Sequence, residues 1–316
     1  MSQDIVLDCK GISHWYGTKK ILYKVDLRII RGEFVALVGP SGCGKSTLLR
    51  AIVGTHPPCE GTITLTEAAT GREWEVKGPG RDRGIVYQQY SLFPHLTAQQ
   101  NVAVGLMLDS TTLPGRILAR WNWWRQKKEY LERAAAWLEK LMLKDAIKLY
   151  PHEMSGGMRQ RVAIAQALIM KPEILLLDEP FGALDEATRE ELQKMLLSLY
   201  QENCQAKKEG KPAPLTILIV THELNEAIYV GDRVAAVSQY WNWEEQGIGP
   251  RPGATIVYDM VAPVFHPDAP RDFQLFADQR DIIRESAFES KTLQSPDIHQ
   301  KFWSEIESGN GQGVLG

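Results

Sequence analysis

The sequence contains few cysteines and no long apolar run. Its 316 residues include four cysteines, and none has the CxxC or Cys-His spacing of a zinc site. They lie far apart, as reduced thiols do, rather than in the pattern of a disulfide framework: Cys9, Cys43, Cys59 and Cys204. No stretch approaches the roughly 18 to 20 uninterrupted apolar residues that span a bilayer. We therefore expect a cytosolic chain that does not itself cross a membrane.

The sequence also has little net charge. Its formal charge is −3, so no overall field attracts nucleic acid, and any basic contact surface must be local. Apolar residues make up 44% of the chain, enough for a buried core in one large domain or two small ones. These numbers favour a globular protein and disfavour a nucleic-acid partner.

Strand patterns and helical patterns follow one another along the chain. Residues 5–65 have the pattern of short strands with turns, and residues 92–171 have helical spacing. Two later runs, Ile174–Leu177 and Thr216–Val220, are uniformly apolar, which is typical of strands buried on both faces. A helical pattern lies between these runs, so an α/β protein with a doubly wound parallel sheet is predicted. The part after Gln239 is weakly patterned and ends in a glycine-rich tail that we expect to be disordered.

A glycine-rich loop follows the predicted strand Phe34–Val38 and precedes a predicted helix, as a P-loop does. Backbone amides and the helix N-terminus of such a loop hold phosphates. Lys45 would reach the β and γ phosphates, and Ser46 would hold magnesium. A chance glycine-rich turn is the alternative, and the strand and helix around the loop argue against it. The loop consists of Gly39, Pro40, Ser41, Gly42, Cys43, Gly44, Lys45, Ser46 and Thr47.

Two carboxylates end the apolar run Ile174–Leu177. Asp178 and Glu179 would lie at the carboxyl end of a strand, where open α/β sheets bind their ligands. In a magnesium-ATP site, Asp178 would bind the magnesium shell, and Glu179 would polarise the attacking water. A solvated acidic turn is the alternative. Beside a P-loop, the pair predicts hydrolysis of ATP with Mg²⁺ as cofactor.

A second small-residue helix start lies at Ser155, Gly156 and Gly157, and it predicts a second anion site. One chain has one P-loop, so this site would serve the nucleotide of another subunit. On its own this run is weak evidence for an anion site, because the same residues also form an ordinary helix cap.

With these three elements in this order, the sequence resembles the ATP-binding subunit of ABC transporters over about residues 5–290. The resemblance implies that Tyr16 stacks on adenine and that Gln88 lies near magnesium. It implies that Asp185 lies at a dimer seam and that His222 contacts the γ phosphate. Glu179, His222, Gln88 and Lys45 would then be the catalytic set, and Ser46, Gln88 and Asp178 the metal ligands.

Each of the four added residues has a structural alternative. A strand-end aromatic such as Tyr16 is usually a packing residue. Asp185 could cap the helix that begins at Glu186, alone or besides its role at a seam. Gln88 and His222 each end an apolar strand, where an isolated polar residue is common.

The resemblance implies an α/β P-loop core with an antiparallel β subdomain and a helical subdomain. We expect a β subdomain and P-loop core at 1–91, a helical subdomain at 92–170, the rest of the core at 171–238 and an extension at 239–316. Two copies would sandwich two ATP molecules on the cytoplasmic face of a membrane. Their partners would be transmembrane permease subunits and a solute-binding protein.

A finer resemblance is to the ATPases of nitrate, sulfonate, taurine and bicarbonate importers. Four segments carry it: Gly78–Gly84, Pro151–Glu153, Phe181–Asp185 and Arg251–Gly253. The signature departs from the common form, since Met154 stands where leucine is usual and Met158 where glutamine is usual. The alternative function is a soluble ABC ATPase acting on nucleic acid or ribosomes. Such proteins usually have two cassettes or long coiled coils, and this chain has one cassette and no heptad run.

Two extra segments that contain tryptophan, at about 109–125 and 239–249, interrupt the family pattern. Between Arg116 and Lys128 lie five basic residues and no acidic one. Rings beside cations suit a membrane interface or the permease rim. The alternative, which we favour from the sequence, is that Trp121 and Trp124 cover the protein's own helical core, against Trp241 and Trp243.

Cys43 allows two hypotheses. A helix N-terminus and Lys45 both favour a reactive thiolate. The other hypothesis is a small inert spacer in the loop.

Overall fold

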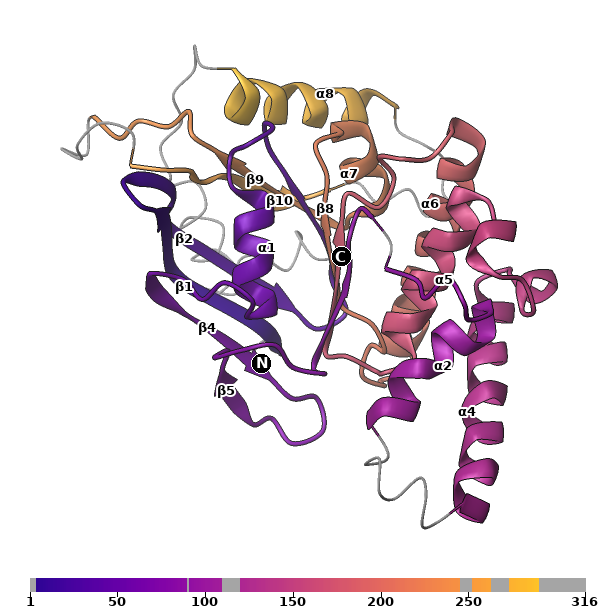
Figure 1. Ribbon diagram of the computed structural model, residues 1–316. Helices are drawn as coiled ribbons and strands as arrows, with labels where there is room; N and C mark the ends of the chain where they lie inside the picture. The colour runs from indigo at the N-terminus through magenta and orange to yellow at the C-terminus, as the bar shows by residue number, and fades with distance from the viewer. Residues whose placement is uncertain (1–3, 90, 110–119, 245–251, 263–272, 290–316) are drawn as a thin grey trace.

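Two β-sheets organise the computed structural model, which describes residues 4–89, 91–109, 120–244, 252–262 and 273–289 (Figure 1). The antiparallel sheet has the strand order β2 (Lys19–Ile30), β1 (Ile5–Tyr16), β4 (Glu60–Thr66), β5 (Glu73–Glu75). The second sheet is parallel except at β10, and its order is β10 (Thr255–Val261), β9 (Arg233–Ser238), β3 (Phe34–Val38), β8 (Ile217–Val220), β7 (Ile174–Asp178), β6 (Arg83–Val86).

Helices cover both faces of the parallel sheet. The described helices are α1 (Lys45–Val53), α2 (Ala98–Asp109), α4 (Arg120–Lys140), α5 (Gly156–Leu168), α6 (Glu186–Lys208), α7 (Leu224–Val230) and α8 (Phe273–Ile283). Three short turns complete them: η1 (Lys144–Ala146), η2 (Pro151–Glu153) and η3 (Arg284–Phe288). None of these helices is long and apolar enough to cross a membrane.

The alternation of side chains along β7 shows how the layers form. Leu176 packs into a core with α1 and the antiparallel sheet, whereas Leu175 and Leu177 pack into a second core with α2, α4, α5 and α6. Successive residues of a strand point to opposite faces, so α1 and the α5–α6 pair lie on opposite faces of the parallel sheet. Both faces are buried, as the uniformly apolar runs predicted.

The weak sequence pattern after Gln239 understated the structure there. β10 pairs with β9, and α8 lies against α7. The strand pattern is interrupted at Asp259, which is fully buried and forms an ion pair of 3.2 Å with buried Arg233. A buried charge with a partner looks, in sequence, like an exposed position. The predicted disordered tail lies outside the described residues.

The predicted packing of Trp124 on the helical core against Trp241 is wrong. Trp241 is 1% exposed and belongs to the core formed by β9, β10, α7 and α8, where it stacks on Tyr23 with ring centroids 5.5 Å apart. Its indole N–H donates to the carbonyl of Gly253 at 2.9 Å. Trp124, by contrast, is 62% exposed on α4. Trp124 therefore does not share a core with Trp241, and the side chain of Trp121 lies outside the described residues.

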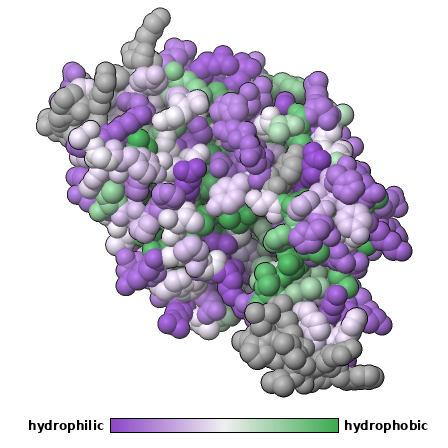
Figure 2. Space-filling model, in the orientation of Figure 1, coloured by the Kyte–Doolittle hydropathy of each residue, from purple (hydrophilic) through white to green (hydrophobic). Residues whose placement is uncertain are grey.

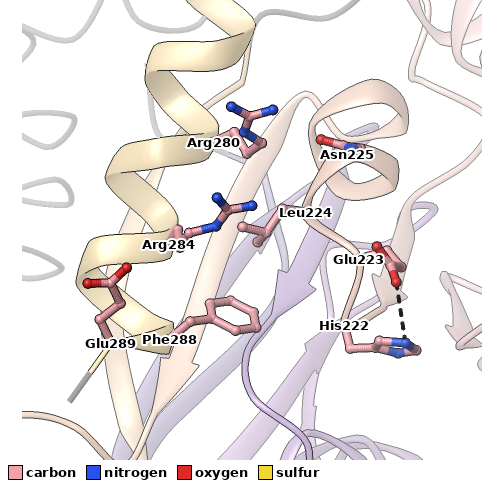
Figure 3. Close-up of a pocket in the computed structure, with 8 residues that line it drawn as sticks. All are labelled: His222, Glu223, Leu224, Asn225, Arg280, Arg284, Phe288 and Glu289. Atoms are coloured by element: carbon pink, nitrogen blue, oxygen red, sulfur yellow. Dashed lines mark ion pairs between the residues drawn. The ribbon is translucent and has the colours of Figure 1, made fainter.

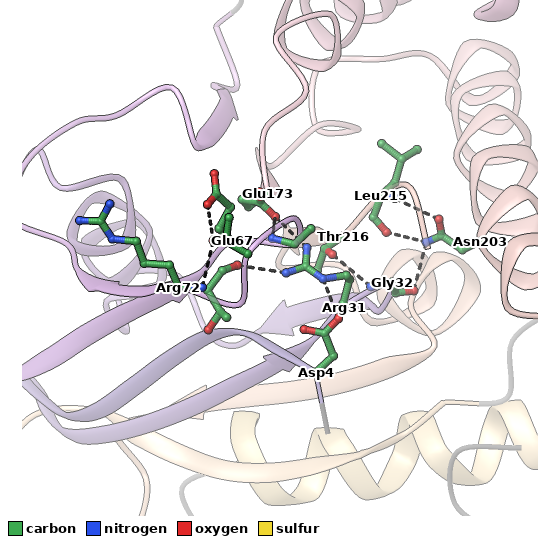
Figure 4. A network of polar contacts seen from close by, with 12 residues as sticks. Asp4, Arg31, Gly32, Glu67, Arg72, Glu173, Asn203, Leu215 and Thr216 are labelled. Carbon is green, nitrogen blue, oxygen red and sulfur yellow. Dashed lines mark hydrogen bonds and ion pairs between the residues drawn. The ribbon is translucent and has the colours of Figure 1, made fainter. Parts of the chain in front are cut away.

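A polar network centred on Arg31 ties the two sheets together (Figure 4). The guanidinium donates to Asp4 at 2.8 Å, to Glu173 at 2.7 Å and to the carbonyl of Thr66 at 3.0 Å. These partners come from the start of β1, the segment before β7 and the end of β4. The buried cation is therefore compensated by two carboxylates and a carbonyl, as burial of a charge requires.

The same network continues to α6 through Asn203, which is fully buried. Its amide nitrogen donates to the carbonyls of Gly32 and Leu215, and its oxygen accepts from the amide of Leu215 at 3.1 Å. Gly32 also donates to the Thr216 hydroxyl at 3.1 Å. One side chain thus fixes the turns that precede β3 and β8.

We expect Asn203→Ala to lower the free energy of unfolding by about 3 kcal/mol, because two carbonyls and an amide lose a buried partner. Urea unfolding measures the change. Gln205→Ala is the matched control, since Gln205 lies on the same helix with an exposed bond to Glu209. Equal losses in the two variants would contradict the assignment.

Candidate active site

The P-loop joins the end of β3 to the start of α1, as predicted. Gly44 precedes α1 with a φ of 107°, which L side chains rarely adopt. A Cβ on Gly39 would come within 2.1 Å of the carbonyl oxygen of Val237 in β9. The loop therefore packs too closely on its neighbouring strand for any residue but glycine at position 39.

Lys45, the first residue of α1, extends back into the loop. It is 5% exposed, and its ammonium group donates to the carbonyls of Gly39 at 2.6 Å and Pro40 at 3.0 Å. Ser46 lies beside it and is exposed, and Thr47 is half-buried. The loop thus holds a cation in its interior, close to where phosphate oxygens are predicted to lie.

Cys43 faces the protein interior. It is 2% exposed, and burial raises the pKa of its thiol, although the nearby Lys45 opposes this shift. The ammonium lies 3.9 Å from the sulfur. Of the two hypotheses for this residue, the inert spacer is favoured.

Glu179 has a strained backbone directly after β7. Its φ is 47°, a left-handed conformation that costs a non-glycine residue about 1–2 kcal/mol. Its N–H donates to the carbonyl of Val220 at 2.8 Å, and its carbonyl accepts from Gly182 at 3.2 Å. Bonds on both sides hold the residue in this conformation, and such strain is concentrated at functional sites.

The parallel pairing of β7 with β8 brings Glu179 to His222. Asp178 is the register partner of Val220, so the residues after both strands emerge at the same edge of the sheet. Nδ1 of His222 lies 3.3 Å from Oε1 of Glu179. Nε2 of His222 lies 3.7 Å from Glu223 (Figure 3). The half-exposed imidazole therefore stands between two carboxylates.

Gln88 reaches the same place from β6, the strand on the other side of β7. A Cβ on Gly182 would lie 3.5 Å from the amide nitrogen of Gln88 and 3.8 Å from Oε2 of Glu179. The two side chains thus flank one glycine. The structure brings together Gln88, Glu179 and His222, which lie far apart in the sequence.

Asp178 and Glu179 place two carboxylates next to each other at this edge of the sheet. Burial raises the pKa of the Asp178 carboxyl, and the charge of Glu179 raises it further, while Arg50 and Lys45 lower it. Two neighbouring carboxylates with an excess of negative charge fit a divalent cation. The described residues contain no cluster of three or more His, Cys, Asp or Glu, so a cation here would need hydroxyl, amide or phosphate oxygens as well.

The remaining predicted residues form a second group at the start of α5 and α6. The Ser155 hydroxyl accepts from the amide of Met158 at 3.2 Å, and Asp185 caps α6 by accepting from the amide of Thr188 at 3.0 Å. A Cβ on Gly157 would lie 1.9 Å from the Thr188 methyl group. Thr188, which sequence analysis missed, thus joins the two motifs. An Asp followed by a Thr three residues later was the available signal.

This second group is separated from the P-loop by the sheet. α1 lies on one face, and α5 and α6 lie on the other (Figure 1). Gly156 is half-exposed and Ser155 is exposed, so both are accessible from outside the chain.

Tyr16 ends β1 with 46% of its surface exposed, and its ring packs edge-on against the ring of His14 at a centroid distance of 4.7 Å. It is therefore not a core residue, which weakens the packing interpretation. Its contact with a base stays a prediction.

Arg280 of α8 and Arg284 of η3, which sequence analysis did not single out, line the same pocket as His222. Arg280 and Arg284 lie one turn apart and line a pocket with residues of α7 and the loop before it (Figure 3). The other lining residues are His222, Glu223, Leu224, Asn225, Phe288 and Glu289. No motif marks these arginines, because only the packing of α8 on α7 places them here.

The sequence profile of the ABC transporter family matches residues 22–182, which contain the P-loop, Gln88, the Ser155–Gly157 run and the Asp178–Glu179 pair. The chain belongs to this family. It is an ATP-hydrolysing subunit, and the predicted fold class and activity are confirmed. A dimeric ATP-binding cassette in a post-hydrolysis state with ADP and phosphate has 29% identity and a TM-score of 0.58, covering 81% of this chain and 98% of that one.

Two relatives with similar sequences are import ATP-binding proteins. An aliphatic sulfonates import ATP-binding protein of Bacillus licheniformis is 40% identical over 238 residues, which are 75% of this chain and 80% of the relative. A nitrate import ATP-binding protein of Synechocystis sp. is 40% identical over 222 residues, 70% of this chain and 72% of the relative.

We expect iodoacetamide at pH 8 to modify exposed Cys59 at least about tenfold faster than Cys43, because a buried thiol with a raised pKa forms little thiolate. Mass spectrometry of labelled peptides measures both rates. In urea the two rates should converge. Labelling of Cys43 as fast as Cys59 in the folded protein would restore the reactive-thiolate hypothesis.

Proposed function

We propose that this ATPase powers the import of a small anion such as nitrate, a sulfonate or taurine. The relatives that import aliphatic sulfonates and nitrate support this solute class, as do the four sequence segments of the finer resemblance. The 3.3 Å contact between Glu179 and His222, at the edge of the sheet beside the P-loop, is the observation that supports its hydrolytic chemistry most directly.

In the proposed mechanism, Glu179 accepts a proton from the attacking water. His222 orients the carboxylate through Nδ1 and contacts the γ phosphate, and the ammonium group of Lys45 turns to the β and γ phosphates. Gln88 helps to position the water, because it flanks Gly182 together with Glu179. The strained backbone of Glu179 limits where its carboxylate can go, and such preorganisation lowers the cost of reaching the transition state.

Ser46, Gln88 and Asp178 would hold Mg²⁺ together with phosphate oxygens of ATP. The cation would neutralise charge that develops on the phosphates. A bound cation would favour the ionised form of Asp178, whose pKa is raised by burial in its absence.

We further propose that two copies complete each other's sites. Ser155, Gly156 and Gly157 of one copy would contact the γ phosphate bound by the P-loop of the other, Asp185 would lie at the seam, and Tyr16 would stack on adenine. The separation of the two groups by the sheet supports this arrangement, because one chain cannot fold its own α5 onto its own P-loop.

The proposed partners are transmembrane permease subunits and, in the complete importer, a solute-binding protein, with the ATPase peripheral to the cytoplasmic face of the membrane. Hydrophobic residues gather over the region of α2 on one face of the molecule (Figure 2). Leu108 at the end of α2 is 62% exposed, and Phe93 before α2 is 42% exposed. Such an area marks an interaction site, so we propose that the helical subdomain, residues 92–170, carries the permease contact.

We expect Glu179→Gln to bind ATP with near-normal affinity and to hydrolyse it about 10²–10⁴ times more slowly, the usual contribution of a general base. Lys45→Ala should lose binding itself, because it removes the cation from the loop. Equilibrium binding of ATP and phosphate release separate these effects. Near-normal turnover in Glu179→Gln would refute the role of Glu179.

We expect ATP with Mg²⁺ to shift the Glu179→Gln variant from monomer to dimer in light scattering. Ser155→Asp in the same background is the control, because aspartate still caps α5 but repels the γ phosphate of a partner. It should bind ATP and stay monomeric. A Glu179→Gln variant that stays monomeric at every ATP concentration, or a Ser155→Asp variant that dimerises equally well, would exclude the shared site.

A further inference from the structure

The start of α4 is the most basic part of this weakly acidic chain. The chain has a net charge of −3, yet the thirteen residues from Arg116 to Lys128 include five basic residues and no acidic one. Trp124, Arg125, Lys127 and Lys128 lie on the first turns of α4. α4 reaches the lower edge of the molecule in Figure 1. We call these four residues the α4 surface.

Two tryptophan–lysine pairs on this helix have the same spacing and opposite surroundings. Lys127 lies over the ring of Trp124 at 5.7 Å, and Lys140 lies over the ring of Trp137 at 4.8 Å. Trp137 packs against the helical core, and Lys140 pairs with Glu202 of α6 at 2.6 Å. The second pair is therefore part of the fold.

The pair of Trp124 and Lys127 has neither a core contact for its ring nor an ion pair for its lysine among the described residues. Trp124 is 62% exposed and is absent from the three cores formed by the described residues. Among those same residues, no carboxylate forms an ion pair with Arg125 or Lys127. Lys128 reaches Glu132 only at 3.9 Å, with both side chains more than 60% exposed.

Trp124 presents an exposed indole beside three cations, of which only Lys128 has an ion-pair partner among the described residues. The ring presents apolar surface together with a polar N–H, a combination that prefers the headgroup layer of a membrane. Lysine and arginine near an anionic leaflet each contribute attraction, and their apolar stems can lie along the boundary while their charges reach the headgroups.

We propose that the α4 surface binds the anionic headgroups of the membrane next to the permease. Trp124 enters the headgroup layer, with Lys127 over its ring, and Arg125 and Lys128 contact lipid phosphates. This contact would fix the helical subdomain relative to the bilayer. It adds a lipid partner to an ATPase whose other proposed partners are proteins.

Flotation of the full-length protein with vesicles tests this proposal. One set of vesicles mixes phosphatidylglycerol with phosphatidylcholine, and the other contains phosphatidylcholine alone. We expect the protein to float with the anionic vesicles at low salt and not with the neutral ones. Raising the salt to 1 M, where the screening length falls to about 3 Å, should release it.

Matched variants locate the contact. Lys127→Gln should lower the partition coefficient about fivefold, the factor that corresponds to about 1 kcal/mol per basic side chain near an anionic surface. Lys140→Gln removes the same charge from the supported pair and should leave the partition coefficient unchanged. Trp124→Ala should lower it more than Met142→Ala, although Met142 is equally exposed, at 61%. All four variants should keep ATP hydrolysis, which shows that they fold.

Three results would overturn the proposal. Failure of the intact protein to float with anionic vesicles at low salt would leave the permease as the occupant of the α4 surface. Equal weakening of binding by Lys127→Gln and Lys140→Gln would mean a general charge effect. Flotation that persists at 1 M salt and with neutral vesicles would show apolar insertion elsewhere on the chain.

Discussion

The arrangement of the candidate hydrolytic residues depends on the pairing of β7 with β8. Their register sets Asp178 opposite Val220, and the N–H of Glu179 then bonds to the Val220 carbonyl at 2.8 Å. That bond continues the ladder by one residue while φ of Glu179 is already left-handed. The carboxylate consequently leaves the sheet edge toward His222 rather than alongside Asp178. Neighbouring residues in the sequence thus acquire different surroundings, as the proposed division between a metal ligand and a base requires.

The layers of the fold follow from the same strands. Because β3, β7 and β8 are apolar on both faces, each must be covered twice, by α1 and the antiparallel sheet on one side and by the helices of the second core on the other. The Arg31 and Asn203 network closes the opposite end of these strands. The candidate site lies at the other end of the strands, where Asp178 ends β7 and His222 follows β8.

Local signals predicted the parts of the site that depend on contiguous residues. The P-loop has a fixed spacing, and Asp178 and Glu179 follow an apolar run, so both were found from the sequence. Thr188, Arg280 and Arg284 were not found from the sequence, because their positions depend on helix packing that no short pattern encodes. For the tryptophans, the sequence suggested one shared core. In the structure, Trp241 stacks on Tyr23 and donates to the carbonyl of Gly253, whereas Trp124 is exposed and belongs to none of the cores. The sequence indicates that an aromatic side chain favours burial, but it does not show which residues that side chain packs against.

The Ser155 run packs directly on the helix that follows Asp185. Gly157 and Thr188 pack so closely that the Ser155 run and the Asp185 turn must move together, since a single methyl group would not fit between them. The Glu179 carbonyl is bonded to Gly182, only three residues before Asp185. The segment from Glu179 to Asp185 therefore connects Glu179, the proposed base, to the surface that we propose meets a second copy. If a second copy completes the γ-phosphate site at Ser155, its contacts lie close to this segment. The left-handed φ of Glu179 then stands at one end of seven residues of backbone whose other end, Asp185, lies at the proposed seam.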